Sequence, residues 1–305
     1  MKGNSRDSHW LSRRLRGRPS VALDDLLILT HAVTFVKCAC ADPSLAVMVD
    51  SPVPWTLERD DFDVARLRAA RRDDVAVVVA ARDEALTVGA VLDSVRFHGD
   101  LVDELIVVDD HSCDDTATVA ENHGARVVRL RGPGGKGAAM AAGVAASRSA
   151  IVVFLDGDVA NPAVDYVGRL IQPLVERPVT QLVKGYYERP LHDQPTGGGR
   201  VNELAARPIL SLLFPGLGEI RQPLAGETAL RRGALDALTL EPGYGVEIAL
   251  LIDVAGRFGT GALAQVDLGV RRHRNRPLDE LRPMATDVLR VALGRYKVDL
   301  ANPFD

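Results

Sequence analysis

The sequence predicts an α/β fold with a Rossmann-like, mostly parallel sheet flanked by helices. Three observations support this prediction: four apolar runs fit buried strands, helical spacing separates them, and acidic residues follow three of the four runs. The 305 residues are 47% hydrophobic and 26% charged, which excludes wholesale disorder. Because ligands of such sheets bind beyond the carboxyl ends of the strands, the acidic residues are the first functional indication.

The regular alternation begins at Val75. Continuous apolar runs predict strands buried on both faces, at residues 75–81, 105–108, 126–130 and 151–155. Helical spacing predicts helices between them, at residues 84–97, 114–123 and 138–147. Before this alternation we expect a short helix within residues 54–72. The second half is less regular, with strands expected at 222–231 and 262–270 and helices at 201–213, 246–258 and 278–293.

Residues 1–53 show weak periodicity and no motif, and we interpret them as a loosely ordered N-terminal extension. The apolar stretch Leu26–Ala41 follows a basic run, but it is too short to span a bilayer, so no integral membrane segment is expected. Three cysteines without disulfide or zinc spacing favour a reducing compartment, and we expect a cytoplasmic protein. A net charge of −4 argues against a nucleic-acid partner.

Asp156-Gly157-Asp158, directly after the fourth predicted strand, is the motif with the clearest chemistry. Two carboxylates on alternate positions at a strand end can hold a divalent cation together with a sugar nucleotide. The cation would stabilise charge on a diphosphate leaving group. The alternative interpretation is a pair of solvated turn carboxylates.

Four further groups of residues suggest anion or sugar binding. Asp110 follows the second predicted strand, where a carboxylate can accept hydroxyl or imide donors. Glycine-rich turns precede helices at Lys136 and at Gly199-Arg200, which suits phosphate or carboxylate groups. Tyr244 and Glu247 share one face of a helix start, and a basic loop contains Arg271, Arg272, His273, Arg274, Asn275 and Arg276. Flexible turns, core packing and a solvated charged face are the competing interpretations.

From Pro54 to Gly294 the chain resembles the glucosyl-3-phosphoglycerate synthases, actinobacterial retaining glycosyltransferases with the GT-A fold. The residues that carry the resemblance are Asp103–Val108, Ile151–Asp158, Gln181–Lys184, Gly197–Val201, Gln222–Glu227, Pro242–Ile248 and Ala264–Glu280. The family transfers glucose from UDP-glucose to the 2-hydroxyl of 3-phosphoglycerate and uses a divalent cation, usually Mg²⁺, with Mn²⁺ as the other candidate. Its members are often dimers, so a homodimer is a hypothesis for this chain.

The resemblance implies a role for each matching residue. The donor would be bound by Ala80, Ala81, Asp83, Glu84, Asp110, Lys136, Asp156, Gly157, Tyr244 and Glu247. The acceptor would be bound by Gly199, Arg200, Val201, Asn202 and Asn275. Asp158 and His273 would ligate the metal, and the candidate catalytic residues are Asp158, His273, Arg200 and Glu227. Glu227 is the one carboxylate considered as a covalent nucleophile.

The implied organisation is one glycosyltransferase domain over residues 54–305. Residues 75–160 would bind the nucleotide sugar, and residues 161–305 would form an irregular acceptor-binding half. Gly157, Asp110 and Asn202 stand where the family has Ser, a small hydroxyl residue and Thr. These departures leave open another donor such as GDP-mannose, another acceptor such as glycerate or polyprenyl phosphate, and an inactive nucleotide-sugar-binding protein.

Overall fold

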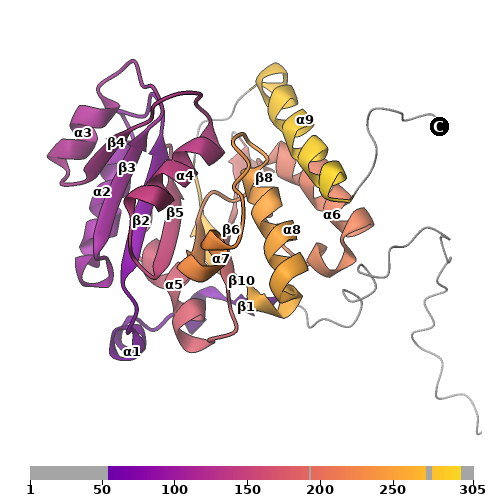
Figure 1. Cartoon of the computed structure of the whole chain (residues 1–305), viewed down its shortest axis with the longest axis horizontal. Coiled ribbons are helices and arrows are strands. Elements are labelled where there is room, and N and C mark those ends of the chain that lie inside the picture. The colour runs from indigo at the N-terminus through magenta and orange to yellow at the C-terminus, as the bar shows by residue number, and fades with distance from the viewer. Residues whose placement is uncertain (1–53, 192–193, 273–276, 297–305) are drawn as a thin grey trace, which may run out of the picture. The chain divides into compact units, whose positions relative to one another are not determined.

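A central sheet of eight strands organises the protein, in the order β1-β10-β6-β9-β5-β2-β3-β4 (Figure 1). Strand β9 runs antiparallel to its neighbours β5 and β6, and the other neighbouring strands are parallel. The computed structural model describes residues 54–191, 194–272 and 277–296, and all of them belong to one compact unit. The predicted extension 1–53, His273 and Asn275 lie outside the described residues.

The strands of this sheet are β1 Trp55–Leu57, β2 Val75–Ala81, β3 Glu104–Asp109, β4 Arg126–Arg129, β5 Ile151–Asp156, β6 Leu182–Glu188, β9 Thr228–Arg231 and β10 Leu263–Val270. A separate two-stranded sheet pairs β7 Pro190–Leu191 with β8 Gln194–Gly197. The α-helices are α1 Val64–Ala70, α2 Val88–Phe97, α3 Thr116–Asn122, α4 Lys136–Ala146, α5 Tyr166–Glu176, α6 Arg207–Leu213, α7 Arg232–Asp236, α8 Val246–Phe258 and α9 Leu278–Arg295.

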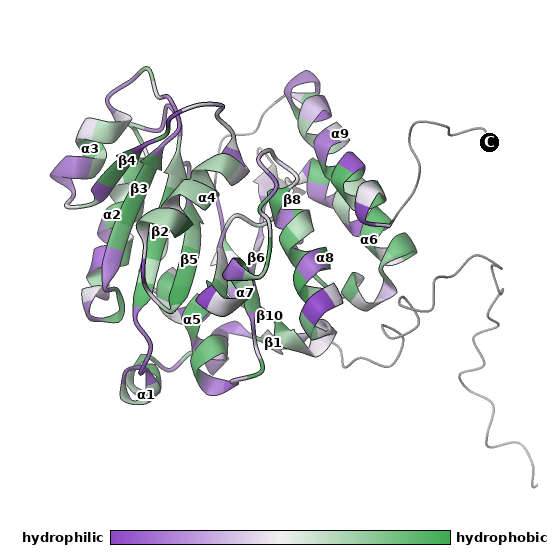
Figure 2. Cartoon of the chain, viewed as in Figure 1, coloured by the Kyte–Doolittle hydropathy of each residue, from purple (hydrophilic) through white to green (hydrophobic). Residues whose placement is uncertain are grey.

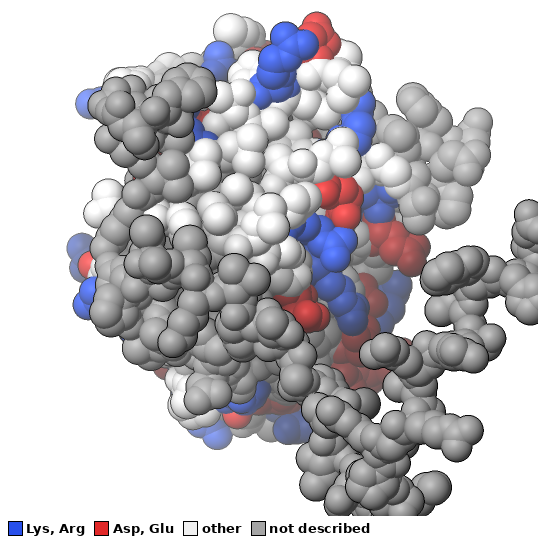
Figure 3. All heavy atoms as spheres, turned by 90° about the vertical axis from the view of Figure 1, so that its right-hand side faces the viewer, with Lys and Arg blue, Asp and Glu red and all other residues white. Residues whose placement is uncertain are grey.

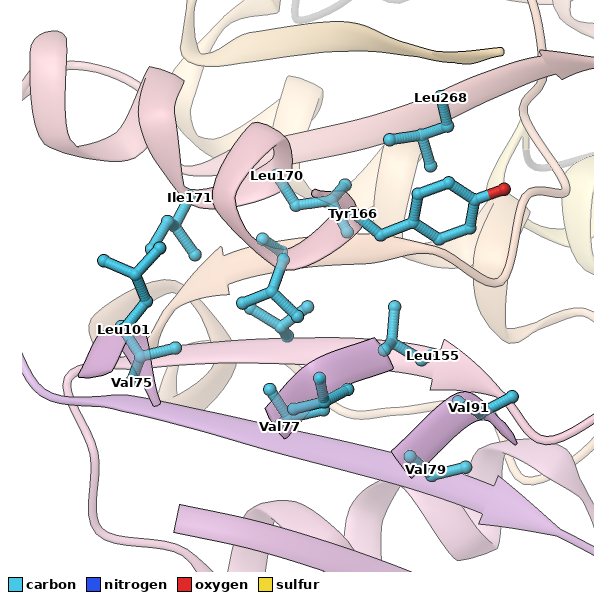
Figure 4. Packing of buried hydrophobic residues seen from close by; sticks show 14 of the residues in the cluster. Val75, Val77, Val79, Val91, Leu101, Leu155, Tyr166, Leu170, Ile171 and Leu268 are labelled. Carbon is cyan, nitrogen blue, oxygen red and sulfur yellow. The ribbon is translucent and has the colours of Figure 1, made fainter. Parts of the chain in front are cut away.

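Helices cover both faces of the sheet, which explains why its inner strands are apolar on both sides (Figure 2). Val77 and Val79 of β2 pack on the face covered by α1, α2, α3 and α5, where Leu170 and Ile171 also lie (Figure 4). Val78, between them, packs on the opposite face with α4, α6, α8 and α9. Each fully buried aliphatic side chain contributes about 1.5–3 kcal/mol, so these rows fix the position of the strand ends.

The four strands predicted in the first half are confirmed at nearly the expected bounds, and the expected helix over residues 54–72 is only partly correct. Its first residues form β1, which pairs with β10 through Trp55 and Ala264, and α1 follows. A three-residue edge strand is too short to produce a recognisable periodicity. The strand expected at 222–231 begins only at Thr228, because the residues before it form a turn. In this turn the amide of Ala225 donates to the carbonyl of Gln222 (3.1 Å).

The helix expected at 201–213 also differs, because it starts as a π-helical turn, Asn202–Ala206, before α6.

Among the residues that the structure describes, none of the helices combines the length and hydropathy needed to cross a bilayer. Figure 3 shows the side of the molecule that carries α6, α8 and α9. On its described part, basic and acidic side chains are scattered among uncharged ones.

Candidate active site

The carboxyl ends of β2, β3 and β5 border a cavity of about 690 Å³, which we call the cleft. Its walls also include the glycine-rich turn before α4 and the segment that opens the π-helical turn. Fourteen predicted residues line it: Ala80, Ala81, Asp83, Glu84, Asp110, Lys136, Asp156, Gly157, Asp158, Gly199, Arg200, Val201, Asn202 and Tyr244. The structure therefore brings residues from both halves of the chain to one place.

Asp83 stabilises one wall of the cleft by joining the loops after β2 and β3. Its oxygen Oδ1 accepts a hydrogen bond from the amide of Cys113 (2.7 Å), and its own amide donates to Ser112 Oγ (3.0 Å). Asp83 and His111 both have positive φ angles, of 57° and 62°. Such backbone costs about 1–3 kcal/mol per residue and is found where the surroundings hold it, so the two loops form one constrained unit.

Asp110 joins this unit to the glycine-rich turn before α4. Its side chain is 9% exposed, and its oxygen Oδ2 accepts from the amide of Gly135 (2.9 Å). The other oxygen, Oδ1, lies 2.9 Å from His111 Nδ1. The carboxylate thus fixes the residue directly before Lys136, and Lys136 begins helix α4.

Six charged side chains form a network that we call the charged cluster: Lys136, Asp156, Asp158 and Arg271, which line the cleft, and Glu227 and Glu247, which do not. Lys136 pairs with Asp156 (2.8 Å) and with Glu247. Arg271 Nη2 donates to Asp156 (3.0 Å) and Asp158 (2.7 Å).

Its other nitrogen, Arg271 Nη1, contacts both oxygens of Glu227, at 2.7 and 2.8 Å. Four carboxylates therefore meet two cations through direct contacts, and the cluster carries an excess of negative charge.

Burial and pairing shift the pKa values in this cluster in predictable directions. Burial opposes the charged forms, but the attraction of Lys136 and Arg271 outweighs it and holds the pKa of Asp156 well below its usual range. Asp156 and Glu247 likewise raise the pKa of Lys136. Nearby on β6, Lys184 is 1% exposed and donates to Thr228 Oγ1 (2.9 Å) and to a backbone carbonyl. Burial lowers the pKa of Lys184 to about 8.

The charged cluster suits a divalent cation that shares its coordination with a bound diphosphate. Asp158 has a side chain that is 32% exposed and lines the cleft, so its carboxylate can serve as an oxygen ligand. Within residues 54–191, 194–272 and 277–296, no three His, Cys, Asp or Glu side chains are grouped to hold a metal by themselves. Mg²⁺ commonly needs only one or two carboxylates plus substrate phosphates and waters, so the residues fit.

Of the predicted site residues that the structure describes, Glu227 and Glu247 are not among those that line the cleft. Glu227 is fully buried and Glu247 is 3% exposed, and both carboxylates face cations of the charged cluster. Asn202, although it lines the cleft, uses its side chain within the fold. Its Oδ1 accepts from the amide of Leu224 (3.3 Å), and its Nδ2 donates to Glu203 (2.9 Å).

The sequence interpretation missed Arg189, and it placed Arg271 in a basic loop that would face either an anion or solvent; both residues line the cleft. Arg271 was grouped with an arginine-rich run, which is typical of a solvated loop, whereas it is 1% exposed. The sequence feature that could have indicated its role is its position directly after β10, at the carboxyl ends of the strands, where ligands bind. Arg189 stands in the same relation to β6.

Residues 76–235 match the family described as Glycosyl transferase family 2. The chain is 45% identical over 260 residues to the glucosyl-3-phosphoglycerate synthase of Mycobacterium tuberculosis (strain ATCC 25618 / H37Rv), with 80% of each protein covered. It is 43% identical over 208 residues to the synthase of Petrotoga mobilis, covering 65% of this chain and 64% of that one. This chain belongs to the glucosyl-3-phosphoglycerate synthases of that family. The resemblance seen in the sequence is confirmed.

Solved structures of these synthases agree with the fold. The Mycobacterium tuberculosis enzyme in complex with Mn²⁺, UDP-glucose and phosphoglyceric acid matches with a TM-score of 0.76 and 45% identity, covering 81% of this chain and 89% of that one. The same enzyme with Mg²⁺ and UDP matches with a TM-score of 0.75 and 44% identity, covering 81% and 88%. The predicted GT-A glycosyltransferase fold is therefore confirmed.

Proposed function

We propose that the protein transfers glucose from UDP-glucose to the 2-hydroxyl of 3-phosphoglycerate and releases UDP. The observation that carries this proposal is a single cleft in which a charged cluster, suited to a metal-bound diphosphate, adjoins a glycine-rich, arginine-bearing segment suited to an anionic acceptor. Membership of the synthases at 45% identity, together with the solved complexes of the relative, supports the same donor and acceptor.

The donor's diphosphate would lie over the end of β5. Lys136, held by Asp156 and Glu247, supplies positive charge there, and Asp158 with the sequence-predicted His273 would hold the cation. Mg²⁺ or Mn²⁺, when bound, offsets the negative charge that develops on the leaving diphosphate. Because these groups are fixed before the substrate arrives, they stabilise the departing UDP with little reorganisation.

The acceptor would be held by Gly199–Asn202 at the start of the π-helical turn, with the sequence-predicted Asn275. Arg200 lines the cleft, and its guanidinium suits a phosphate or carboxylate. In the reaction the bond from the sugar's C1 to the diphosphate breaks and its electron pair leaves with UDP. The acceptor's 2-hydroxyl forms the new bond to C1 and gives its proton to a phosphate oxygen of the departing UDP or to solvent. Orientation of the two substrates is therefore the main contribution of these residues.

The resemblance implies retention of the anomeric configuration, and the position of Glu227 favours a mechanism without a covalent glucosyl-enzyme. Its carboxylate is buried beneath the cleft and bonded to Arg271. We therefore assign Glu227 the role of positioning Arg271. A homodimer and a cytoplasmic location stay predictions of the sequence, the second supported by three cysteines without a disulfide framework.

The test is UDP release with Mg²⁺, UDP-glucose and 3-phosphoglycerate, beside reactions with GDP-mannose or glycerate. Release that requires 3-phosphoglycerate is expected for the wild type. Asp158→Ala should lower the rate by about 100-fold or more, and His273→Ala should show a similar loss. Asp93→Ala, which removes an exposed carboxylate on α2, is the matched control and should leave the rate unchanged. UDP release that ignores the acceptor, or that occurs only with another pair, would contradict the proposal.

A further inference from the structure

Arg189, which directly follows β6, is a cation of the cleft without an anionic partner among the described residues. Its Nη2 donates to the hydroxyl of Tyr187 (2.8 Å), and its guanidinium lies 4.9 Å from the centre of that ring. Its Nε is buried and has no hydrogen-bond partner in the described part of the chain. Arg189 thus lines the cleft with an unpaired, buried Nε and without an ion pair to any described residue.

Two other cations of the cleft, Lys136 and Arg271, have carboxylate partners and so contrast with Arg189. Lys136 contacts two carboxylates, and Arg271 contacts three. Removing a charge from water costs several kcal/mol unless a partner of opposite sign compensates it. A bound anion in the cleft would supply the partner that Arg189 lacks.

The position of Arg189 indicates which substrate would supply this anion. The segment Gly197–Arg200, which we call the glycine loop, packs directly on Arg189, and the amide of Gly198 donates to the Arg189 carbonyl (3.1 Å). A Cβ atom at position 198 would lie only 2.7 Å from the Cβ of Arg189, and one at position 199 would lie 3.3 Å from its Cδ. Glycines at these two positions thus let the loop approach the arginine. Arg189 and the proposed acceptor site therefore form one unit.

Tyr187 connects this unit to the charged cluster. Its hydroxyl oxygen also accepts a hydrogen bond from Arg271 Nη1 (2.7 Å), so two guanidinium groups converge on one phenol. Arg271 in turn holds Asp158, the proposed metal ligand. An anion bound at Arg189 would consequently lie on the side of the glycine loop that faces the reacting centre.

We infer that Arg189 binds an oxyanion of the acceptor, its carboxylate or its phosphate, and that Tyr187 positions the Arg189 guanidinium for this contact. The inference rests on the proposed function. It adds to the acceptor site a residue that the sequence pattern did not indicate.

The test compares Arg189→Gln, which removes the charge, with Arg189→Lys, which keeps it. Hydrogen bonds to charged groups correspond to about tenfold or more in binding, so the KM for 3-phosphoglycerate should rise at least tenfold in Arg189→Gln and recover in part in Arg189→Lys. The Kd for UDP-glucose with Mg²⁺, measured by calorimetry without acceptor, should stay within about twofold of the wild type. Tyr187→Phe should raise the KM for the acceptor by a smaller factor.

Glycerate, which lacks the phosphate, identifies the group that is bound. If Arg189 binds the phosphate, Arg189→Gln loses the preference for 3-phosphoglycerate over glycerate; if it binds the carboxylate, both acceptors weaken alike. Arg221→Gln is the matched control because Arg221 also stacks on a tyrosine, Tyr186 (4.3 Å), but its side chain is 48% exposed and paired with Glu58. Arg221→Gln should leave the KM for 3-phosphoglycerate and the Kd for UDP-glucose unchanged.

An unchanged KM for 3-phosphoglycerate in a folded Arg189→Gln protein would overturn the inference. So would an equal loss of donor and acceptor affinity in both Arg189 variants, since that pattern indicates a structural role. A wild-type protein that releases UDP only with another acceptor would instead overturn the proposed function, so the two failures are distinguishable.

Discussion

Replacing Glu227 by glutamine tests whether this buried carboxylate supports Arg271 or attacks the sugar. Glu227 is 0% exposed and Arg271 is 1% exposed, and two hydrogen bonds of 2.7 and 2.8 Å join them. Breaking a buried ion pair costs about 3–5 kcal/mol. Glutamine keeps one accepting oxygen, and Arg271 keeps its bonds to Asp156 and Asp158. We therefore expect the free energy of unfolding to fall by an amount near the lower limit of this range, about 3 kcal/mol.

Urea unfolding followed by fluorescence or circular dichroism measures this loss. With a slope of about 2–3 kcal/mol/M, 3 kcal/mol lowers the midpoint by about 1 M. Glu121→Gln is the control, because Glu121 pairs with Arg129 at the surface, where the two side chains are 49% and 62% exposed. Such a pair contributes about 0–1 kcal/mol, so its midpoint should barely move.

Activity of the folded Glu227→Gln protein decides the role of the side chain. A positioning role predicts that kcat falls by about tenfold or less, because Arg271 retains two of its three carboxylates. A covalent nucleophile predicts a loss of about 10⁴ or more. An unchanged urea midpoint, or a folded variant with the larger loss of kcat, would refute the reasoning.

Three further predictions concern the surroundings of the site. A Cβ atom at position 226 would lie 2.1 Å from Oδ1 of Asp156, so Gly226→Ala should displace this carboxylate and lower kcat at least tenfold. Gly256→Ala is the control and should leave kcat unchanged, because a Cβ atom at position 256 would have nothing within 4 Å. Burial lowers the pKa of Lys184 to about 8, whereas the pKa of lysine in the unfolded chain is about 10.4. Between these values the unfolded chain binds more protons than the folded protein, so the free energy of unfolding rises as the pH increases from 8 to 10. This rise of about 2 kcal/mol in urea unfolding should be absent from Lys184→Met, and an equal rise in both proteins would contradict the assignment. Asp110→Ala removes the acceptor of the Gly135 amide and should weaken UDP-glucose binding several-fold in calorimetry. Asp110→Asn keeps an accepting oxygen and should keep most of the affinity for UDP-glucose. Equal losses of affinity in the two variants would contradict a role through this hydrogen bond.

The first half of the fold could be predicted because its strands are buried on both faces. A short run such as Val75–Ala81, rich in β-branched residues, is typical of a strand covered by helices on each side, and the structure confirms this prediction. Edge strand β1 and the late start of β9 could not be predicted, because both depend on pairing with segments far along the chain. Local patterns do not contain that information.

The site was predictable where its residues follow strands or glycine turns, as Asp158 and Lys136 do. Burial was the missing information for the rest. Arg271 looks like part of a solvated basic loop until three carboxylates are seen around it, and Glu227 looks available for chemistry until its position beneath the cleft is known. Charge and spacing identify candidate groups, and only tertiary packing shows which of them can reach a substrate.

The antiparallel direction of β9 has a consequence for how this enzyme can change. Because β9 runs antiparallel to β6, the end of β6 and the start of β9 lie at the same end of the strands, where the cleft is, and the connection between them is described at residues 189–191 and 194–227. That connection contains Arg189, the glycine loop and the π-helical turn. Part of this connection is fixed by the core, because Ala206, Leu210, Leu217 and Ile220 are at most 1% exposed and belong to the cluster that packs on Val78 of β2. Substitutions in this connection can therefore alter the proposed acceptor site without changing a strand, provided that these core side chains are kept.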